Sequence, residues 1–294
     1  MGHWYIITPC LRSFPRLAAC VRSVADQAGE GLYIHHHVQD GGSTDGSVAW
    51  LARWQQEHAT TPNYRFTYAS TPDRGMYDAL NQAWAQMPET ATFTAHLNAD
   101  EQYLPGALQQ VSEAFAHRPA IDILETTHIA CDRENRYHCH RRPVQPHAFS
   151  SRMTAELTTC TTFWRASAFR RLGLRFDLRY RIIEDLPFMH AVVASGIAIA
   201  TCPRLFTSAY TVTGRNMGWT PAGWRELRDY NASQPLINRL LYPFSKRWVN
   251  LRRRLVDCLC PPPRELCLYH GDADSRKCER IEHPTCIWRL NRND

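Results

Sequence analysis

Hydrophobic positions in residues 1–120 follow two alternating periods. Short runs rich in β-branched and aromatic residues are each followed by a segment whose apolar residues recur three or four positions apart. The pattern predicts strands at residues 4–8, 32–38, 64–69 and 92–97, and helices at residues 14–28, 77–87 and 105–116 and through Val48, Leu51 and Trp54. Strands that alternate with helices predict an α/β fold with a mainly parallel central sheet and helices on both faces.

The alternation of strand-like and helix-like patterns is weaker in the second half of the chain. Residues 125–160 are rich in His, Arg, Thr and Cys without clear periodicity, and we interpret them as a substrate-facing insertion. Regular patterns return as helices at residues 166–172 and 185–195 and as strand-like runs at 197–201 and 206–212. Beyond about residue 216 the chain becomes rich in Trp and Arg, so we expect a domain boundary there.

The C-terminal segment has its own pattern. Residues 237–259 place apolar residues at helical spacing among six Lys or Arg residues, with a proline break expected at Pro243. This basic amphipathic pattern fits two readings: a helix packed on the main domain with a solvated basic face, or a helix that docks on an anionic inner-leaflet membrane surface. Three prolines at 261–263 end the helix, and we expect the Cys-rich remainder to be poorly ordered, with zinc binding a weak option.

Charge and cysteine content narrow the classes of function. Residues 1–236 carry 22 Arg, no Lys and 21 acidic residues, a net charge of +1, whereas residues 237–294 carry a net +5. A uniformly basic nucleic-acid surface is therefore not expected. The 11 cysteines are an odd number, and no apolar run is long enough to span a bilayer. We expect a cytoplasmic protein, peripheral at the inner face of the plasma membrane if the basic helix docks there.

Acidic residues follow two of the predicted strands. Asp40 begins an Asp-Gly-Gly-Ser-Thr-Asp-Gly-Ser run, and Asn98, Asp100 and Glu101 follow the fourth strand. Because the carboxyl ends of parallel strands meet at one edge, we expect these groups to cluster there. Oxygen ligands of this kind suit Mg²⁺ or Mn²⁺ bridging a nucleotide diphosphate. Taken alone, each run is equally consistent with a turn that caps a helix.

Two further acidic segments complete the pattern. In the run from Asp73 to Asn81, Asp78 and Asn81 fall three residues apart and share one helical face. The pair Glu184–Asp185 precedes an apolar helix, where it is either a stabilising cap or contains a general base for a hydroxyl nucleophile.

Together these motifs resemble those of family 2 glycosyltransferases of the GT-A fold. Thr8-Pro9, the runs from Asp40 and from Asp73, the sequence 97–101 and the pair Glu184–Asp185 stand in the family's order and spacing. The resemblance covers residues 4–215 and is closest to bacterial enzymes that build surface polysaccharides.

The resemblance implies a metal-dependent inverting glycosyltransferase. Its domain would span residues 1–215, with a donor-binding half at about 1–124 and an acceptor-binding half at about 125–215, followed by the extension 216–294. Asp185, beside Glu184, would be the catalytic base that deprotonates a glycan or lipid-linked acceptor. Asn98–Asp100 would be the family's Asp-x-Asp motif, with Asp100 as the Mn²⁺ or Mg²⁺ ligand. The residues expected to bind the nucleotide-sugar donor are Thr8, Pro9, Asp40, Asp73, Gly75, Asp78, Asn81, Asn98 and Asp100.

Two alternatives remain open from the sequence. Asn98 replaces the first acid of the motif, which favours a non-catalytic nucleotide-sugar-binding protein on a degenerate GT-A fold. A sugar-phosphate nucleotidyltransferase shares the α/β sheet and the acidic metal ligands, but it normally opens with a Gly-rich phosphate loop, where this chain has Thr8-Pro9-Cys10-Leu11-Arg12.

Overall fold

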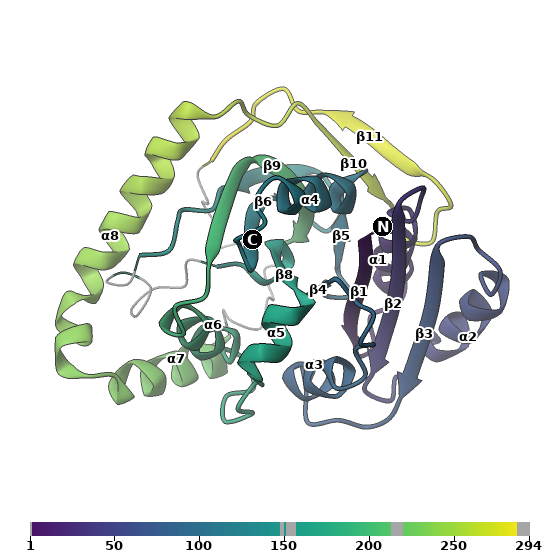
Figure 1. Cartoon of the computed structure of the whole chain (residues 1–294), viewed down its shortest axis with the longest axis horizontal. Helices are drawn as coiled ribbons and strands as arrows, with labels where there is room; N and C mark the ends of the chain where they lie inside the picture. The colour runs from purple at the N-terminus through teal and green to yellow at the C-terminus, as the bar shows by residue number, and fades with distance from the viewer. Residues whose placement is uncertain (1, 148–149, 151–156, 213–219, 287–294) are drawn as a thin grey trace.

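A mixed β-sheet with helices on both faces forms the centre of the molecule in the computed structural model (Figure 1). The structure describes residues 2–147, 150, 157–212 and 220–286. The strands in these residues are β1 (Gly2–Cys10), β2 (Leu32–Asp40), β3 (Tyr64–Ser70), β4 (Phe93–His96), β5 (Glu101–Tyr103), β6 (Ile123–Cys131), β7 (Tyr137–Arg141), β8 (Thr162–Arg165), β9 (Ile199–Thr211), β10 (Glu265–Tyr269) and β11 (Arg276–Arg280). The helices are α1 (Arg16–Ala25), α2 (Ser47–Glu57), α3 (Met76–Trp84), α4 (Ala107–Ala116), α5 (Ala166–Leu172), α6 (Asp185–Ala194), α7 (Pro221–Ser233) and α8 (Leu236–Leu259), with a short 3-10 turn at Thr159–Thr161.

The parallel half of the sheet consists of the strands that the hydrophobic pattern predicts. β3, β2, β1 and β4 lie side by side in that order and run parallel. Residues 4–10 of β1 are all buried, as is typical of a central strand covered on both faces. The register pairs Cys10 with Asp40, and Asp40 with Ser70. The carboxyl ends of β1, β2 and β3 therefore meet at one edge.

Successive side chains of β1 contact different helices. On one face, Trp4 and Ile6 belong to a cluster that includes apolar residues of α1, α2 and α4. On the other face, Tyr5 and Ile7 cluster with residues of α3, α5 and α6. The cause is the period-2 alternation of a strand, and the predicted covering of both faces is confirmed.

The stretch at residues 125–160 enters the sheet instead of forming an irregular insertion throughout. All nine residues of β6 are buried, and the strand pairs in parallel with β9 and antiparallel with β7 and β8. A strand covered on both faces normally reads as a continuous apolar run, but residues 125–128 of β6 are polar although buried, so the sequence shows no such run here. The interpretation as an insertion is therefore wrong for β6 and β7. Residues 148–149 and 151–156 lie outside the described residues.

The two strand-like runs expected at residues 197–201 and 206–212 are one strand, β9. Its pairing with β6 is irregular around Thr127, where the partner shifts from Thr201 to Phe206. Pro203 lies inside this irregular part, which explains why the sequence looked like two strands with a break between them.

The C-terminal segment forms two helices and a hairpin. α8 continues across Pro243, so the expected break does not occur. β10 and β11 pair antiparallel and are joined by a disulfide bond between Cys267 and Cys278, which the count of cysteines did not foresee. The expectation of poor order is therefore wrong for this hairpin. The boundary expected near residue 216 falls within residues 213–219, outside the described part of the chain.

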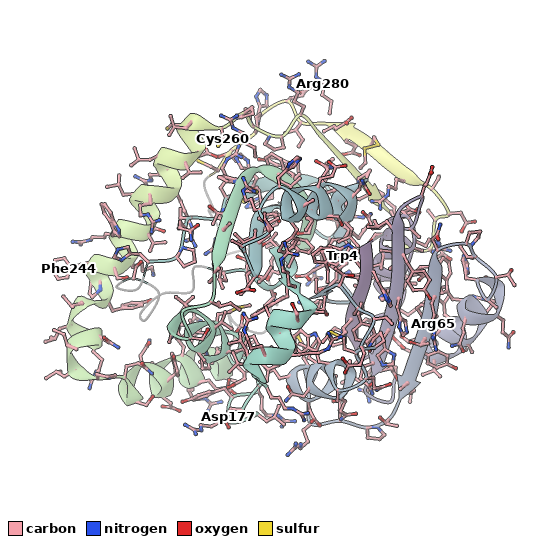
Figure 2. The ribbon with its side chains drawn as sticks, in the orientation of Figure 1. Trp4, Arg65, Asp177, Phe244, Cys260 and Arg280 are labelled. Carbon is pink, nitrogen blue, oxygen red and sulfur yellow. A yellow bond between two sulfur atoms is a disulfide. The ribbon has the colours of Figure 1, made fainter. Side chains whose placement is uncertain are left out.

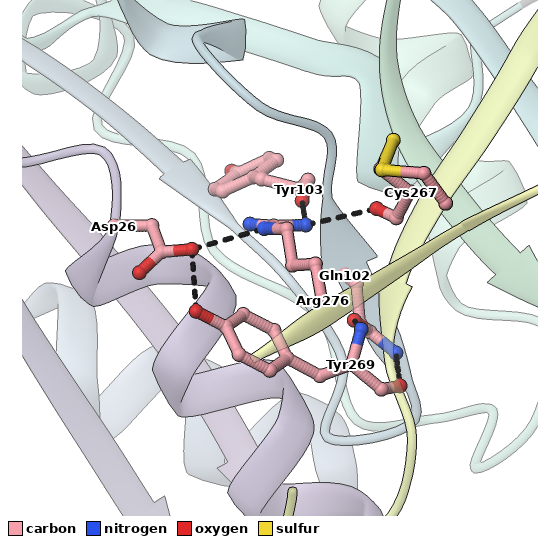
Figure 3. Close-up of a disulfide and its surroundings, with 7 residues drawn as sticks. Asp26, Gln102, Tyr103, Cys267, Tyr269 and Arg276 are labelled. Atoms are coloured by element: carbon pink, nitrogen blue, oxygen red, sulfur yellow. Dashed lines mark hydrogen bonds and ion pairs between the residues drawn. A yellow bond between two sulfur atoms is a disulfide. The ribbon is translucent and has the colours of Figure 1, made fainter. Parts of the chain in front are cut away.

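The hairpin packs on the first half of the chain (Figure 3). The Tyr269 hydroxyl donates at 2.6 Å to the carboxylate of Asp26, the residue that follows α1, and Arg276 donates to the same oxygen at 2.9 Å. Gln102 on β5 exchanges two hydrogen bonds of 3.0 and 2.8 Å with the backbone of Tyr269. The hairpin therefore covers α1 and β5. Across the described residues, no helix has both the length and the apolar composition needed to cross a membrane.

Candidate active site

Asp40, the last residue of β2, is fully buried at the carboxyl edge of the sheet. Its Oδ2 accepts hydrogen bonds from the N–H groups of Gly42 at 3.0 Å and Ser43 at 2.9 Å and from the Ser70 hydroxyl at 2.6 Å. Burial acts to raise the pKa of this carboxyl, but the hydrogen bonds outweigh it and the net shift is downward. Oδ1 is buried with no hydrogen-bond partner among the described residues. An ionised carboxylate with a free oxygen can accept a hydrogen bond from a base or a ribose.

Asp73 lies against the glycine turn that follows Asp40. A Cβ atom at Gly41 would lie 2.8 Å from Asp73 Oδ2, so a larger residue at this position would displace the Asp73 carboxylate. Asp73 Oδ1 accepts the N–H of Gly75 at 2.8 Å. Burial raises the pKa of Asp73, and the charges of Asp78 and Asp40 add to the increase. The structure thus brings together two segments that were expected to bind the donor, the run from Asp40 and the run from Asp73.

Thr8 and Pro9 are buried at the end of β1. The Thr8 hydroxyl shares a hydrogen bond of 2.9 Å with His36 Nε2 and lies 3.7 Å from the Cys20 sulfur. This hydroxyl is therefore engaged within the core. A contact of Thr8 or Pro9 with a donor stays a prediction.

Two residues of the run from Asp40, where the sequence allowed a turn that caps a helix, hold the loop after β1. Ser43 Oγ accepts the N–H of Arg12 at 2.7 Å, and Asp45 accepts the N–H of Phe14 at 3.0 Å. Asp45 also accepts the N–H and the hydroxyl of Ser47 at the start of α2. The signal was present in the Ser-Thr-Asp sequence, since these side chains favour helix caps and turns.

Residues 98–101 form a tight turn after β4. The N–H of Asn98 donates to Glu101 Oε2 at 2.8 Å, and the N–H of Glu101 donates to the Asn98 carbonyl at 2.9 Å. Burial, followed by the charge of Asp100, raises the pKa of Glu101 to about 8. Burial also raises the pKa of Asp100. Asn98 Oδ1 is buried and has no hydrogen-bond partner in the described part of the chain.

This turn offers oxygen atoms for part of a metal site. Within the described ranges, no group of three or more His, Cys, Asp or Glu residues could hold an ion by itself. Mg²⁺ in nucleotide sites is usually held by one or two carboxylates together with phosphate oxygens. The Asp100 carboxylate and the unpartnered Asn98 Oδ1 fit such a partial ligand set.

Asp185 begins α6 and contacts the helix of the Asp73–Asn81 segment. The single hydroxyl proton of Tyr77 on α3 is shared between two acceptors, the Ile182 carbonyl at 2.9 Å and Asp185 Oδ1 at 3.2 Å. The N–H of Leu186 donates to the same Oδ1 at 3.0 Å. Burial raises the pKa of Asp185, although both hydrogen bonds act to lower it. A partly buried carboxylate with a raised pKa is suited to general-base work.

Three other expected site residues make contacts within the protein. Each uses its side chain to hold irregular backbone or a helix start, and a direct contact with a ligand stays a prediction. The contacts are those of Glu184 with the Asp177 N–H (2.8 Å), of Asn81 with the Phe176 carbonyl and N–H (2.9 and 3.0 Å), and of Asp78 with the Arg74 N–H (3.1 Å).

Tyr210 on β9 pairs with the strand that directly follows Asp100, and sequence reasoning missed this pairing. β5 pairs with β9 so that Glu101 is opposite Tyr210. Burial raises the pKa of the Tyr210 phenol, and nearby acidic groups, among them Glu101, Asp100 and Asp185, raise it further. A three-residue strand gives no local signal of so distant a partner.

Comparison with known sequences gives one family. The family model described as Glycosyl transferase family 2 matches residues 5–175. Two curated relatives, from two strains of Mycobacterium tuberculosis, are both described as uncharacterized glycosyltransferases. Each is 32% identical over 119 residues, which cover 40% of this chain and 42% of the relative.

Solved structures share the fold over most of this chain. S. aureus TarS matches with a TM-score of 0.60 at 12% identity, over 94% of this chain and 60% of that chain. TarS 1–349 in complex with UDP-GlcNAc matches with a TM-score of 0.56 at 12% identity, over 88% and 84%. The mannosyltransferase PcManGT from Pyrobaculum calidifontis, in complex with GDP-Man and Mn²⁺, matches with a TM-score of 0.59 at 17% identity, over 86% and 71%. The likeness concerns the fold, and the predicted GT-A fold is confirmed.

Proposed function

The chain belongs to glycosyltransferase family 2, and on that basis we propose that it transfers a sugar from a nucleotide-diphosphate donor to an acceptor hydroxyl, with inversion at the anomeric carbon. One contact carries the proposal. Asp185, a partly buried carboxylate, is hydrogen-bonded to Tyr77, which lies in the segment expected to bind the donor.

In this proposal Asp185 is the general base. Its carboxylate takes the proton of the acceptor hydroxyl while the acceptor oxygen bonds to the anomeric carbon and the bond from that carbon to the diphosphate breaks. A single displacement of this kind inverts the centre. The products are the glycosylated acceptor, a nucleoside diphosphate and a proton that Asp185 releases. Glu184, the other acidic residue of the pair, positions the preceding loop by accepting the N–H of Asp177.

Donor binding is proposed for the carboxyl edge of the parallel strands. Asp40 Oδ1 accepts a hydrogen bond from the nucleoside, and Asp73 with Gly75 lies beside it. Asn98 and Asp100 face the diphosphate. Mn²⁺ or Mg²⁺, when held by Asp100, supplies positive charge that stabilises the departing diphosphate. The remaining donor residues of the proposal are Thr8, Pro9, Asp78 and Asn81.

Asp185→Asn tests the assignment of the base. We expect the variant to lose sugar transfer, because an amide takes no proton, while donor affinity stays near that of the unchanged protein. Transfer is measured as nucleoside diphosphate released with acceptor, and donor affinity by titration calorimetry with Mn²⁺. Asp177→Asn, a neutralised carboxylate in the same loop, is the matched control. Transfer retained in Asp185→Asn would contradict the proposal, and release of pyrophosphate would favour a nucleotidyltransferase.

For the donor and acceptor we propose nucleotide sugars and a glycan or lipid-linked acceptor, used in surface polysaccharide synthesis in the cytoplasm. The resemblance to bacterial enzymes of that kind supports the acceptor class. UDP-GlcNAc and GDP-Man, bound by two structural neighbours, are the first donors to test. A thermal-shift screen of nucleotide sugars with Mn²⁺ would rank them.

We also propose that the domain spans residues 1–215, with donor and acceptor halves that meet near residue 124, and that residues 216–294 form an extension. The contacts of Tyr269 and Arg276 with Asp26 support joint folding of the extension and the domain.

The extension is proposed to dock on an anionic membrane through α8. One stripe of this helix carries large apolar side chains that are 48–75% exposed, and Figure 2 shows Phe244 pointing away from the rest of the molecule. The stripe consists of Leu236, Ile237, Leu240, Phe244, Trp248, Leu251, Leu255 and Leu259. A helix that exposes apolar residues beside basic ones is suited to the interface of a bilayer.

Charge favours a membrane over a second copy of the chain as the occupant. α8 carries six Lys or Arg residues and a single acid, Asp257. That acid is bound to His140 and Arg142, so it does not neutralise the exposed face. Two copies would bring like charges together, whereas anionic lipids attract each basic residue near the surface by about 1 kcal/mol.

Vesicle flotation tests this docking. We expect the full chain to float with vesicles of phosphatidylcholine and phosphatidylserine and not with phosphatidylcholine alone, and added salt should weaken binding. Trp248→Ser should reduce flotation, because it removes an exposed aromatic ring from the stripe. Trp224→Ser on α7, which is 52% exposed, is the matched control. Equal flotation of both variants, or Trp248-dependent dimers without lipid, would overturn the membrane proposal.

A further inference from the structure

The loop that precedes Asp185 has no regular structure, and side chains from other elements satisfy its backbone. Between α5 and α6, residues 174–184 belong to no strand or helix. Asn81 binds both backbone groups of Phe176, and Glu184 accepts the N–H of Asp177. Because backbone N–H groups require partners when removed from water, such side chains set the course of the loop.

The last turn of this loop is held from α7. Glu226 Oε1 accepts the N–H of Arg181 at 3.1 Å, and Glu226 Oε2 accepts the N–H groups of Ile182 at 2.9 Å and Ile183 at 3.3 Å. One carboxylate therefore gathers three successive N–H groups. The next residues along the chain are Glu184 and Asp185.

The same short segment also contacts the donor side. The Ile182 carbonyl accepts the Tyr77 hydroxyl, and the Arg181 guanidinium donates to the Arg74 carbonyl at 3.1 Å. Residues 181–183 therefore lie between α7 and the Asp73–Asn81 segment, with hydrogen bonds to both. A shift of this segment would move Asp185 relative to the donor.

We infer that Glu226 is a positioning residue for sugar transfer. From its place on α7, its carboxylate holds residues 181–183 so that Asp185 reaches the acceptor hydroxyl. The inference rests on the proposed function, because it takes Asp185 as the base. Glu226 lies beyond the residues 5–175 that match the family model, so the family comparison does not assign it. It follows that α7, although it is part of the extension, also contributes to the catalytic site.

Kinetics and hydrogen exchange together test this role. Glu226→Ala should lower kcat on the order of 100-fold, as expected for misplacement by about 1 Å, with little change in the donor KM. Amide exchange in the peptide 178–186 should rise in the same variant. Glu226→Gln should restore much of both, because its amide oxygen can still accept from the N–H groups of Ile182 and Ile183. Asp229→Ala, an exposed acid on the same helix, should match the unchanged protein.

The outcomes separate this inference from the proposed function. An unchanged kcat in Glu226→Ala, or a fall in kcat without faster exchange in 178–186, overturns the positioning role. A loss in Glu226→Gln as large as in Glu226→Ala also overturns it. Transfer retained by Asp185→Asn overturns the proposed function instead, and the exchange measurement still reports whether Glu226 holds the loop.

Discussion

Tyr77 joins the two halves of the candidate site through one hydroxyl group. It donates to Asp185 and to the Ile182 carbonyl, and its ring packs against Phe176 at 4.8 Å between centroids. Of the three contacts, only the one with the Asp185 carboxylate involves an ionisable group, so only this contact affects a pKa. The hydroxyl stabilises the ionised form of Asp185 and so opposes the effect of burial on the pKa of that residue.

Tyr77→Phe should therefore change the pH dependence of sugar transfer. A base works when deprotonated, so kcat falls as the pH drops through its pKa. Removing the hydroxyl raises the pKa of Asp185 further, and the acidic limb should move to higher pH by about one unit, since a hydrogen bond to a charged group contributes about 1.5 kcal/mol.

The measurement is a pH–rate profile at saturating donor. Tyr5→Phe is the matched control, because it removes a buried tyrosine hydroxyl that donates to the Ala83 carbonyl, away from Asp185. A limb in Tyr77→Phe that stays in place or moves to lower pH would contradict the assignment of Asp185 as the titrating base.

At the scale of residues, sequence reasoning succeeds where a side chain ends a strand. Asp40 and Asp100 follow strands with clear patterns, so their common edge could be predicted. The contacts of Glu226 and the pairing of Tyr210 with Glu101 could not be predicted, because the partners lie more than 40 residues away and no local pattern encodes them.

At the scale of elements, α8 is fastened near its C-terminal end. Asp257 accepts hydrogen bonds from His140 at 2.7 Å and from Arg142 at 2.9 Å, and both partners are almost fully buried. Arg142 also donates to the Pro261 carbonyl at 2.7 Å. The helix is thus tied to the strand β7 and the residue after it, while its apolar stripe stays exposed.

Asp257→Ala should destabilise the fold by about 3 kcal/mol, because it leaves the buried Arg142 charge without its acid. For a chain of this size the thermal midpoint should fall by roughly 6 °C or more. Asp274→Ala is the control, since Asp274 pairs with Arg22 while 94% exposed and should change stability by about 1 kcal/mol or less. Differential scanning calorimetry compares the two variants, and equal midpoints would contradict the anchoring role.

The elements predicted best were those with a clear apolar pattern. The amphipathic α8 and the apolar run of β1 could be located from the sequence, and β9 was located as two runs, whereas β6 was not. The middle of β6, from Glu125 to His128, is polar although buried, and β9 is interrupted by an irregular pairing with β6. In both strands the tertiary environment, which the sequence does not display locally, determines the structure.

At the scale of the whole molecule, basic residues of the C-terminal segment lie both inside the protein and on its surface. Arg276 faces inward, where it donates to Asp26 and to the Tyr103 carbonyl. Most basic residues of α8 are exposed instead. The net charge of this segment therefore predicted an outward surface but not the inward hairpin, whose Arg276 binds Asp26, 250 positions earlier in the chain.

The hairpin also fixes an order of events during synthesis. β5 and α1 leave the ribosome long before β10, because Gln102 and Tyr269 are separated by 167 positions. At translation rates of about 5–20 residues per second, that interval is on the order of ten seconds or more. During this interval, the groups of α1 and β5 that the hairpin later covers are exposed, and other chains and chaperones can bind them. Among the described strands, β10 and β11 are thus made after all the others, and they close the surface of α1.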